Sequence, residues 1–341
     1  MKKVIIMTAK ELASILNISA ATVSMVFNDK PGISEETREL VLQKAKEHGY
    51  QPNKKLVQQS NSVIHFVIYK KSGNIITDTP FFSQLIEGVN LRCQKFNCTQ
   101  EITYVYNNES LQKLINTISK SNNSGIILLA TEISKSDSNF INDIEFPIVL
   151  LDNYLEDYFV DSVVINNTQG AYLETKHLIE NGHKKIGYLQ SSFELGNFNE
   201  RQDGYYKALL QHNIPIEDKY ICPLSPTGIQ SYEDMNKYLS TSPELPTAYF
   251  ADSDQIAISA IRSLKEHGVK VPEDVSIIGF DDIPTSSMMV PGLTTMRVPK
   301  QNLGSLAVDR VLKKIQEPKD ETIKIEVSTT LIERQSVKRL G

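Results

Sequence analysis

Small, hydroxyl-bearing and flexible side chains are concentrated in one stretch near the N-terminus, at Ala20, Ala21, Thr22, Ser24 and Met25. The methyl groups of alanine and threonine can contact the methyl groups of thymine, and hydroxyl groups can bond to bases or phosphates. Because these side chains are small or flexible, a helix that carries them can enter the major groove of DNA. The chemistry that they favour is contact with the edges of base pairs.

Three short capped helices are predicted to position this stretch. Thr8 and Glu11 form a capping box at the start of the first helix, which is expected to end near Asn17. Ser19 caps the second helix and Ser34 caps the third. The small core between them is expected to contain Leu12, Ala13, Leu16, Val23, Val26, Phe27, Thr37, Val41 and Ala45. This is the pattern of a helix-turn-helix.

The first 56 residues carry nine lysines or arginines and six acidic residues, whereas the whole chain has a formal net charge of −5. The N-terminal part is therefore at +3 and the rest of the chain at −8. A positive surplus at one end fits attraction to phosphate groups at that end. Three charges are modest, so two copies are expected to act together.

From Val63 onward, short β-branched runs alternate with amphipathic stretches, which is typical of βαβ units in a parallel sheet. Ligands bind beyond the carboxyl ends of such strands, so the candidates for ligand contact are Asp152 and Asn153, the segment 252–254, and Asp281 and Asp282. Helix capping explains an aspartate at a strand end equally well. The expected strands are Val63–Tyr69, Ile102–Tyr106, Gly125–Ala130, Pro147–Asp152, Lys185–Leu189, Ala248–Asp252 and Ser276–Asp281.

Length and composition limit the class of protein. A chain of 341 residues with 40% hydrophobic content can form a large core beside a small headpiece. No apolar run approaches the length of about 20 residues that spans a bilayer, and residues 1–6 lack the features of a signal peptide. We therefore expect a cytoplasmic protein without membrane contact. Cys93, Cys98 and Cys222 form no metal-binding pattern and are expected to be reduced thiols, and no cofactor is expected.

Several segments, taken together, are similar to one family. They are the headpiece pattern, Phe81–Gly88 (FFSQLIEG), Gly182–Ile186 (GHKKI), Val271–Asp282 (VPEDVSIIGFDD), Leu293–Thr295 (LTT) and Glu333–Ser336 (ERQS). In this order and spacing they resemble the LacI/GalR transcriptional regulators. The likeness covers nearly the whole chain.

The resemblance implies a small all-α helix-turn-helix headpiece and an α/β core of two lobes, built like type I periplasmic binding proteins from doubly wound sheets. It also implies a homodimer that binds a palindromic operator in double-stranded DNA, usually as a repressor, with a sugar or related small effector between the lobes. The expected ranges are 1–52 for the headpiece, 53–62 for the hinge and 63–341 for the core, with the first lobe at about 63–164 plus 293–320 and the second at about 165–292 plus 321–341.

The resemblance also assigns DNA contacts. The positions that face base edges in this family match Ala20, Ala21 and Met25. The positions that hold phosphates match Thr8, Thr22, Ser24 and Asn28. Many relatives have arginine where Met25 stands, so we do not expect a guanine to be read here by a bidentate arginine.

The linker departs from the family pattern. Relatives often carry an Ala-Arg-x-Leu hinge helix whose leucine enters the minor groove, whereas Asn53–Ser60 is shorter. Leu56 could act as a substitute wedge, and its alternative role is an apolar residue of a plain linker. Lys54 and Lys55 could contact phosphates in either case, or be solvated.

For the effector, the resemblance places an aromatic ring at the start of the first core helix, here Phe81 or Phe82. A flat ring suits the C–H face of a sugar, while carboxylates and a guanidinium bond to its hydroxyls. The matching polar positions are Arg201, Ser253 and Asp281. Many relatives have asparagine where Ser253 stands, so its hydrogen bonds are expected to differ. Core packing is the alternative for Phe82, and a surface ion pair is the alternative for Arg201.

Three other functions remain open from the sequence. An α/β enzyme is one, although the chain has no Gly-x-Gly-x-x-Gly after the first strand, no phosphate-binding loop, no His-Glu-x-x-His and no Gly-x-Ser-x-Gly. A secreted solute-binding protein would fit the body alone but not the helix-turn-helix. A DNA-binding regulator controlled by a partner protein would fit the acidic body.

Overall fold

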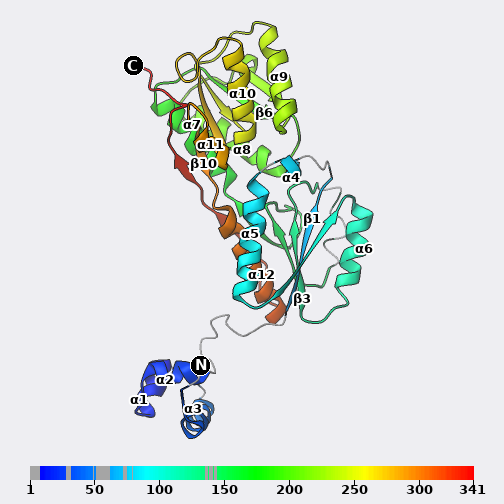
Figure 1. The fold of residues 1–341 in the computed structure, drawn as a ribbon, viewed down its shortest axis with the longest axis vertical. Helices are drawn as coiled ribbons and strands as arrows, with labels where there is room; N and C mark the ends of the chain where they lie inside the picture. The colour runs from blue at the N-terminus through cyan, green and yellow to red at the C-terminus, as the bar shows by residue number, and fades with distance from the viewer. Residues whose placement is uncertain are drawn as a thin grey trace. The chain divides into compact units, whose positions relative to one another are not determined.

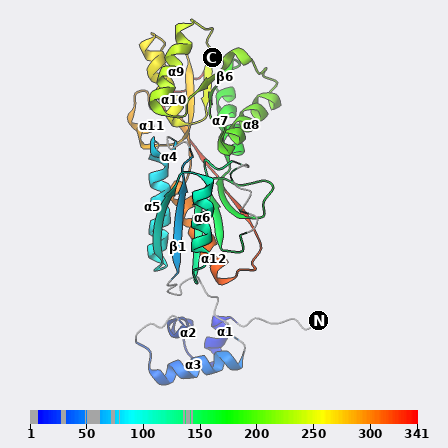
Figure 2. The same ribbon diagram turned by 90° about the vertical axis from the view of Figure 1, so that its right-hand side faces the viewer.

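The computed structural model describes residues 8–27, 32–48, 50, 62–71, 75–78, 80–134, 137, 141 and 144–341. The chain divides into two compact units, Met1–Ser60 and Asn61–Gly341, which we call the headpiece and the core. Each is described by itself (Figures 1 and 2).

The described part of the headpiece contains three helices, α1 (Ala9–Ile15), α2 (Ala20–Phe27) and α3 (Glu35–Glu47). The capping box is confirmed, because the Glu11 amide donates to Thr8 Oγ1 and the Thr8 amide donates to Glu11 Oε2. Ser19 Oγ accepts from the Thr22 amide at 2.9 Å, so Ser19 caps α2 as expected. The caps in the sequence therefore set where these helices begin.

The packing of these helices confirms most of the expected headpiece core. The fully buried members are Leu12, Ala13, Val23, Val26, Val41 and Ala45. Leu16 and Phe27 pack against this cluster but stay partly exposed. Thr37 is not part of it, because its hydroxyl bonds to Ser34 Oγ at 2.7 Å. The first helix ends at Ile15, slightly before the expected end.

The first lobe of the core is a six-stranded parallel sheet in the order β11-β5-β4-β3-β1-β2. Its strands are β1 (Val63–Tyr69), β2 (Thr99–Val105), β3 (Ser124–Leu129), β4 (Ile148–Leu151), β5 (Asp161–Ile165) and β11 (Lys324–Val327). Its helices are α4 (Ile75–Asp78), α5 (Pro80–Lys95), α6 (Asn108–Ile118) and α12 (Lys300–Gln316). Helix α6 covers one face of the sheet, and α5 and α12 cover the other.

The second lobe is a six-stranded sheet in the order β12-β10-β9-β8-β6-β7, in which only β12 is antiparallel. Its strands are β6 (Ile186–Ser191), β7 (Ile221–Leu224), β8 (Ala248–Ala251), β9 (Ser276–Asp281), β10 (Thr294–Arg297) and β12 (Thr330–Ile332). Its helices are α7 (Asn167–Glu180), α8 (Gly196–Gln211), α9 (Gly228–Ser240), α10 (Asp254–Glu266) and α11 (Pro284–Met288). The doubly wound, two-lobed architecture is therefore confirmed.

The expected lobe ranges are wrong near the C-terminus. β10 pairs with β9 in the second lobe, although 293–320 is expected in the first, and β11 pairs with β5 in the first lobe, although 321–341 is expected in the second. The chain crosses between the lobes after β5, after β10 and after β11. The alternation of half-buried and exposed residues in β11 gives no hydrophobic run that would reveal its sheet.

Helices α5 and α12 lie in backbone contact (Figure 1). A Cβ atom on Gly88 of α5 would lie 2.2 Å from the carbonyl oxygen of Gln301, and one on Gly304 of α12 would lie 2.4 Å from that of Leu85. Only glycine permits this approach at either position. The two helices therefore form one rigid pair, in which the N-terminal ends of α5 and α12 keep fixed positions relative to each other.

We expect Gly88→Ala to lower the free energy of unfolding by about 1–3 kcal/mol, because backbone atoms of α12 occupy the space of the new methyl group. Urea denaturation followed by circular dichroism would measure it. Asn90→Ala, at an exposed position of the same helix, is the control and should cost less than about 0.5 kcal/mol. Equal stability of the Gly88→Ala variant and the unchanged protein would contradict the close packing of α5 and α12.

The remaining structural expectations concern membranes, metals and cysteines. Within the described ranges, no helix is long and apolar enough to cross a membrane. The same residues contain no group of three or more His, Cys, Asp or Glu side chains arranged to hold a metal ion. Cys93 and Cys222 are buried free thiols, and Cys98 is a half-buried one.

Candidate DNA-reading surface and effector cleft

Helix α2 presents part of the expected DNA-reading set to solvent. Ala21 and Ser24 are exposed, whereas Thr22 and Met25 are half-buried. Ala20 is also half-buried, because it packs against the headpiece core. Because the apolar side of α2 is used by Val23 and Val26, the face with Ala21 and Ser24 is the one that a DNA groove could meet.

Two of the hydroxyl groups expected to hold phosphates, those of Thr8 and Thr22, already take part in caps. Thr8 Oγ1 donates to Glu11 Oε2 at 2.9 Å, and Thr22 Oγ1 lies 2.8 Å from Ser19 Oγ. A phosphate contact at Thr8 or Thr22 would therefore share or replace a capping bond. The other expected contacts, at Asn28, Lys54, Lys55 and Leu56, lie outside the described residues.

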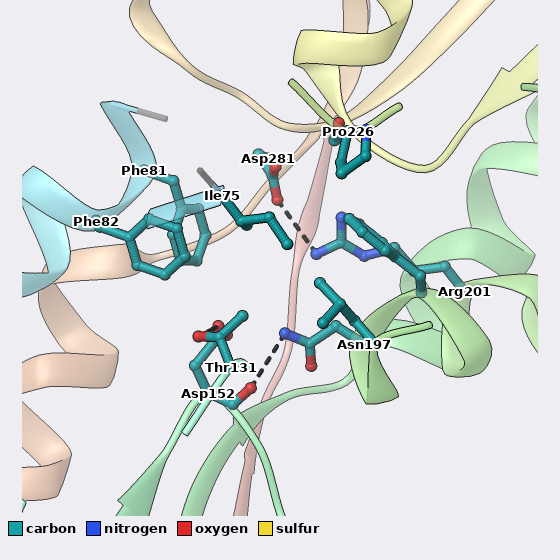
Figure 3. A pocket seen from close by; sticks show the side chains of 12 residues that line it. Ile75, Phe81, Phe82, Thr131, Asp152, Asn197, Arg201, Pro226 and Asp281 are labelled. Atoms are coloured by element: carbon teal, nitrogen blue, oxygen red, sulfur yellow. Dashed lines mark hydrogen bonds and ion pairs between the residues drawn. The ribbon is translucent and has the colours of Figure 1, made fainter. Parts of the chain in front are cut away.

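A cleft between the two lobes gathers all six residues expected to contact an effector (Figure 3). It encloses about 460 Å³ of empty space, its opening to solvent included. The expected residues in its wall are Phe81, Phe82, Asp152, Arg201, Ser253 and Asp281. The residues that the sequence did not single out are Ile75, Thr131, Leu195, Asn197, Phe198 and Pro226. Asn197 precedes Arg201 by one helical turn on α8, a spacing that could have revealed it.

Arg201 is the most extensively bonded side chain of the cleft, and it is 3% exposed. Its Nε donates to Asn167 Oδ1 at 2.9 Å, its Nη1 donates to the carbonyl oxygen of Asp252, and its Nη2 donates to Asp281 Oδ1 at 3.2 Å. The guanidinium also lies 3.8 Å from the centroid of the Phe280 ring. The surface ion pair considered for Arg201 is therefore wrong, because Arg201 and the residues to which it donates are buried.

Asp152 directly follows β4 and lies in the left-handed region, with φ of 66°. Thr131 Oγ1 donates to its Oδ2 at 2.7 Å, and Asn197 Nδ2 donates to its carbonyl oxygen at 3.1 Å. Its Oδ1 is buried without a hydrogen-bond partner among the described residues. Burial raises the pKa of Asp152 to about 7, against the lowering influence of Thr131 and Arg201. An incoming hydroxyl donor could satisfy this oxygen.

Two aromatic rings line the first-lobe side of the cleft. Phe81 and Phe82 stand at the start of α5 and are 4% and 5% exposed. Their ring centroids lie 5.1 Å apart with an interplanar angle of 74°, an edge-to-face pair. Both rings are core residues and cleft residues at once, so the two readings of Phe82 do not exclude each other.

In the segment 252–254, which follows β8, the two aspartates accept hydrogen bonds from other parts of the second lobe. Asp252 accepts from Tyr188 Oη and from the Ser191 amide, and Asp254 accepts from the Ser286 hydroxyl and the Ile283 amide. Only Ser253 of this segment lines the cleft, and its hydroxyl also caps α10. Capping and cleft lining therefore coincide at Ser253.

Behind the cleft, Glu174 of α7 is fully buried, and neither of its carboxylate oxygens has a hydrogen-bond partner in the described part of the chain. Burial raises the pKa of Glu174 well above its usual value, and Asp254 raises it further, whereas Arg201 opposes the shift. The folded state therefore favours the protonated form. The contribution of Glu174 to the free energy of unfolding is fully present below the unfolded pKa of about 4.5. It is lost as the pH rises from that value through the raised pKa of the folded state.

We expect Glu174→Gln to remove this loss, which amounts to about 1.4 kcal/mol per pH unit between the unfolded and folded pKa. The variant should match the unchanged protein near pH 4 and be the more stable of the two at pH 8. Urea denaturation at both pH values would test this. Glu180→Gln, at the exposed end of the same helix, is the control. An unchanged pH dependence in Glu174→Gln would show that Glu174 is ionised in the folded protein.

Comparison with known proteins supplies two family matches. The model for bacterial regulatory proteins of the lacI family matches residues 8–53. The model for a periplasmic binding protein-like domain matches residues 175–337. The first range covers the helix-turn-helix, and the second covers most of the second lobe together with α12 and β11.

Whole-chain relatives give the same result. An HTH-type transcriptional repressor PurR from Actinobacillus pleuropneumoniae serotype 3 is 32% identical over 98% of this chain and 99% of its own. A probable HTH-type transcriptional repressor ExuR from Bacillus subtilis is 30% identical over the same shares. A solved LacI family transcriptional regulator from Enterococcus faecium, with bound ribose, is 26% identical, covers 81% of this chain and 100% of its own, and has a TM-score of 0.69.

Proposed function

Because this chain belongs to the LacI family of bacterial transcriptional regulators, we propose that it binds a palindromic operator as a homodimer and that a sugar-like ligand in the interlobe cleft controls that binding. Its relatives are named transcriptional repressors, not enzymes, and repression is accordingly the proposed outcome. A DNA-binding protein of this kind acts in the cytoplasm. The exposed face of α2, with Ala21 and Ser24, is the observation that supports the proposed DNA binding.

The homodimer is supported by exposed apolar side chains on both lobes. In the first lobe, Leu91 of α5 and Ile102 and Tyr104 of the edge strand β2 are each about half exposed. In the second lobe the strongly exposed apolar residues include Ile229, Met288 and Val290. An uncovered edge strand with apolar side chains favours association, and a two-fold dimer would bury the same patches on both copies. Sedimentation velocity would show whether a dimer exists.

The ligand class follows from the walls of the cleft. Two aromatic rings face a set of hydrogen-bonding groups that includes the Arg201 guanidinium, the carboxylates of Asp152 and Asp281 and the amide of Asn197 (Figure 3). A sugar offers an apolar C–H face to rings and hydroxyl groups to carboxylates and guanidinium. Ribose in the relative from Enterococcus faecium supports the same class of ligand.

The test is selection of genomic DNA fragments by the purified full chain at fixed, moderate salt, followed by sequencing of the bound fragments. A palindrome enriched upstream of transport or catabolic genes is the expected result. Thermal shifts with ribose and with free pentoses and hexoses would then test the cleft. A folded dimer that enriches no sequence, with and without these sugars, would contradict the proposed operator binding.

A further inference from the structure

Lys300 is a buried cation that does not contact the space inside the effector cleft. It is the first residue of α12 and 4% exposed, and it does not line the cleft. Burial of an ammonium group is costly, and the positive end of the helix dipole at α12 adds to the cost. Its position therefore requires compensation from the groups around it.

The compensation comes from the opposite lobe. Lys300 Nζ donates to the main-chain carbonyl oxygen of Asp281 and, at 3.2 Å, to that of Asp282. Asp281 is the last residue of β9 and Asp282 follows it, and both have positive φ, of 113° and 51°. Such conformations are unfavourable for non-glycine residues and persist only when neighbouring groups hold them. One ammonium group thus donates hydrogen bonds to two successive carbonyl oxygens of a strained turn.

The side chains of this turn are held separately. The Asp281 carboxylate accepts from Arg201 in the cleft at 3.2 Å. The Asp282 carboxylate accepts from Arg297 and Arg334 at 2.6 Å each. Lys300 is therefore the group that fixes the main chain of the turn from α12, while arginines of the second lobe and the segments next to it fix its carboxylates.

On the first-lobe side, Lys300 belongs to the rigid pair of α5 and α12. Its Nζ lies 5.6 Å from the centroid of the Phe81 ring, and the glycine contacts prevent α5 from sliding along α12. Any displacement of Lys300 therefore displaces the aromatic wall of the cleft with it. The Asp281 and Asp282 carbonyl oxygens, to which Lys300 donates, belong to the second-lobe wall of the cleft, which includes the Asp281 side chain.

We propose that Lys300 is a positioning residue that couples the two lobes, because its bonds to the Asp281 and Asp282 carbonyls set the separation of the aromatic and carboxylate walls of the cleft. It contacts no ligand in this role. When the lobes rearrange, the bonds of Lys300 to this turn must stretch or re-form. The inference depends neither on the identity of the ligand nor on DNA binding.

Lys300→Met tests the coupling, because it keeps the length and apolar stem of the side chain and removes the donors. Spin labels on cysteines introduced at the exposed positions Lys113 of α6 and Gln211 of α8 report the distance between the lobes by pulsed electron resonance. All samples carry Cys98→Ser and are diluted with unlabelled protein, so that each measured pair lies within one protomer. We expect Lys300→Met to broaden the distribution and to lengthen its mean by more than about 2 Å.

Lys314→Met is the matched control. Lys314 lies on the same helix, donates to the Asp320 carbonyl at 2.7 Å and pairs with Asp161 at 3.2 Å, all within the first lobe. It should lower stability and leave the interlobe distance unchanged. Lys300→Arg, which keeps the donors, should restore the distribution of the unchanged protein.

Two results would overturn the proposal. One is the same distance distribution for Lys300→Met as for the unchanged protein, and the other is an equal change in Lys314→Met. If Lys300→Met does not fold, Lys300→Gln carries the same expectation, since its shorter side chain cannot reach both carbonyls. A denaturation curve for each variant separates lost coupling from lost folding.

Discussion

Arg201→Ala is expected to lower the free energy of unfolding by about 3–5 kcal/mol and to remove sugar binding by the cleft. The guanidinium donates to Asn167, to the Asp252 carbonyl and to Asp281, so its loss leaves a buried carboxylate without its charged partner. The loss of binding follows because the same guanidinium lines the cleft, where it can donate to sugar hydroxyl groups. Urea denaturation measures the first effect, and calorimetric titration with whichever sugar shifts the melting temperature measures the second.

Arg262→Ala is the control for this prediction. The Arg262 side chain is 67% exposed and pairs with Glu266 one helical turn away, so its removal should cost less than about 1 kcal/mol. Sugar binding should be unchanged, because Arg262 does not line the cleft. A variant Arg201→Ala with normal stability and normal sugar affinity would refute the assignment of Arg201 to the site.

Ala21→Glu is expected to weaken operator binding at least about 100-fold while leaving the fold intact. Ala21 is exposed on α2 outside the headpiece core, so a longer side chain does not disturb packing. A carboxylate at this position would meet the negative potential of the groove and keep the helix from close approach. Fluorescence anisotropy with a labelled operator fragment at fixed salt would measure the change.

Gln43→Glu provides the matched control, since it adds the same charge at an exposed position of α3. It should reduce operator affinity far less than Ala21→Glu, in proportion to long-range repulsion alone. Ala20 is less suitable for this test, because it packs against the headpiece core. Equal losses in both variants would mean that net charge, and not the α2 face, governs binding.

The headpiece was predictable because its signals are local. A capping box at Thr8 and Glu11 and a cap at Ser19 act within three residues of sequence, and the structure shows the bonds that they imply. Two of the buried strands were equally visible, since β1 and β9 have the ranges expected from their apolar runs, whereas the buried strand β5 was not predicted. Short strands without such runs, among them β7, β11 and β12, were not predicted.

Buried polar networks were beyond the reach of sequence. Nothing in the local pattern distinguishes Asp281, which lines the cleft, from Asp252, which accepts bonds from Tyr188 and Ser191. Both stand at the carboxyl end of a strand, and only the direction in which the folded backbone points each side chain separates them. The same holds for Lys300, whose partners lie almost twenty residues away in the other lobe.

The sequence by itself determined the class of fold, the helix-turn-helix and the residue types available to the cleft, because caps and hydrophobic periodicity act over a few residues. The tertiary structure alone decided the sheet to which β10 and β11 belong, the partners of Arg201 and the contact between Gly88 and Gln301. The contact between Gly88 and Gln301 and the pairing of β11 with β5 depend on crossings between the lobes, which bring together segments more than a hundred residues apart. Contacts of that range leave no periodic trace in the sequence.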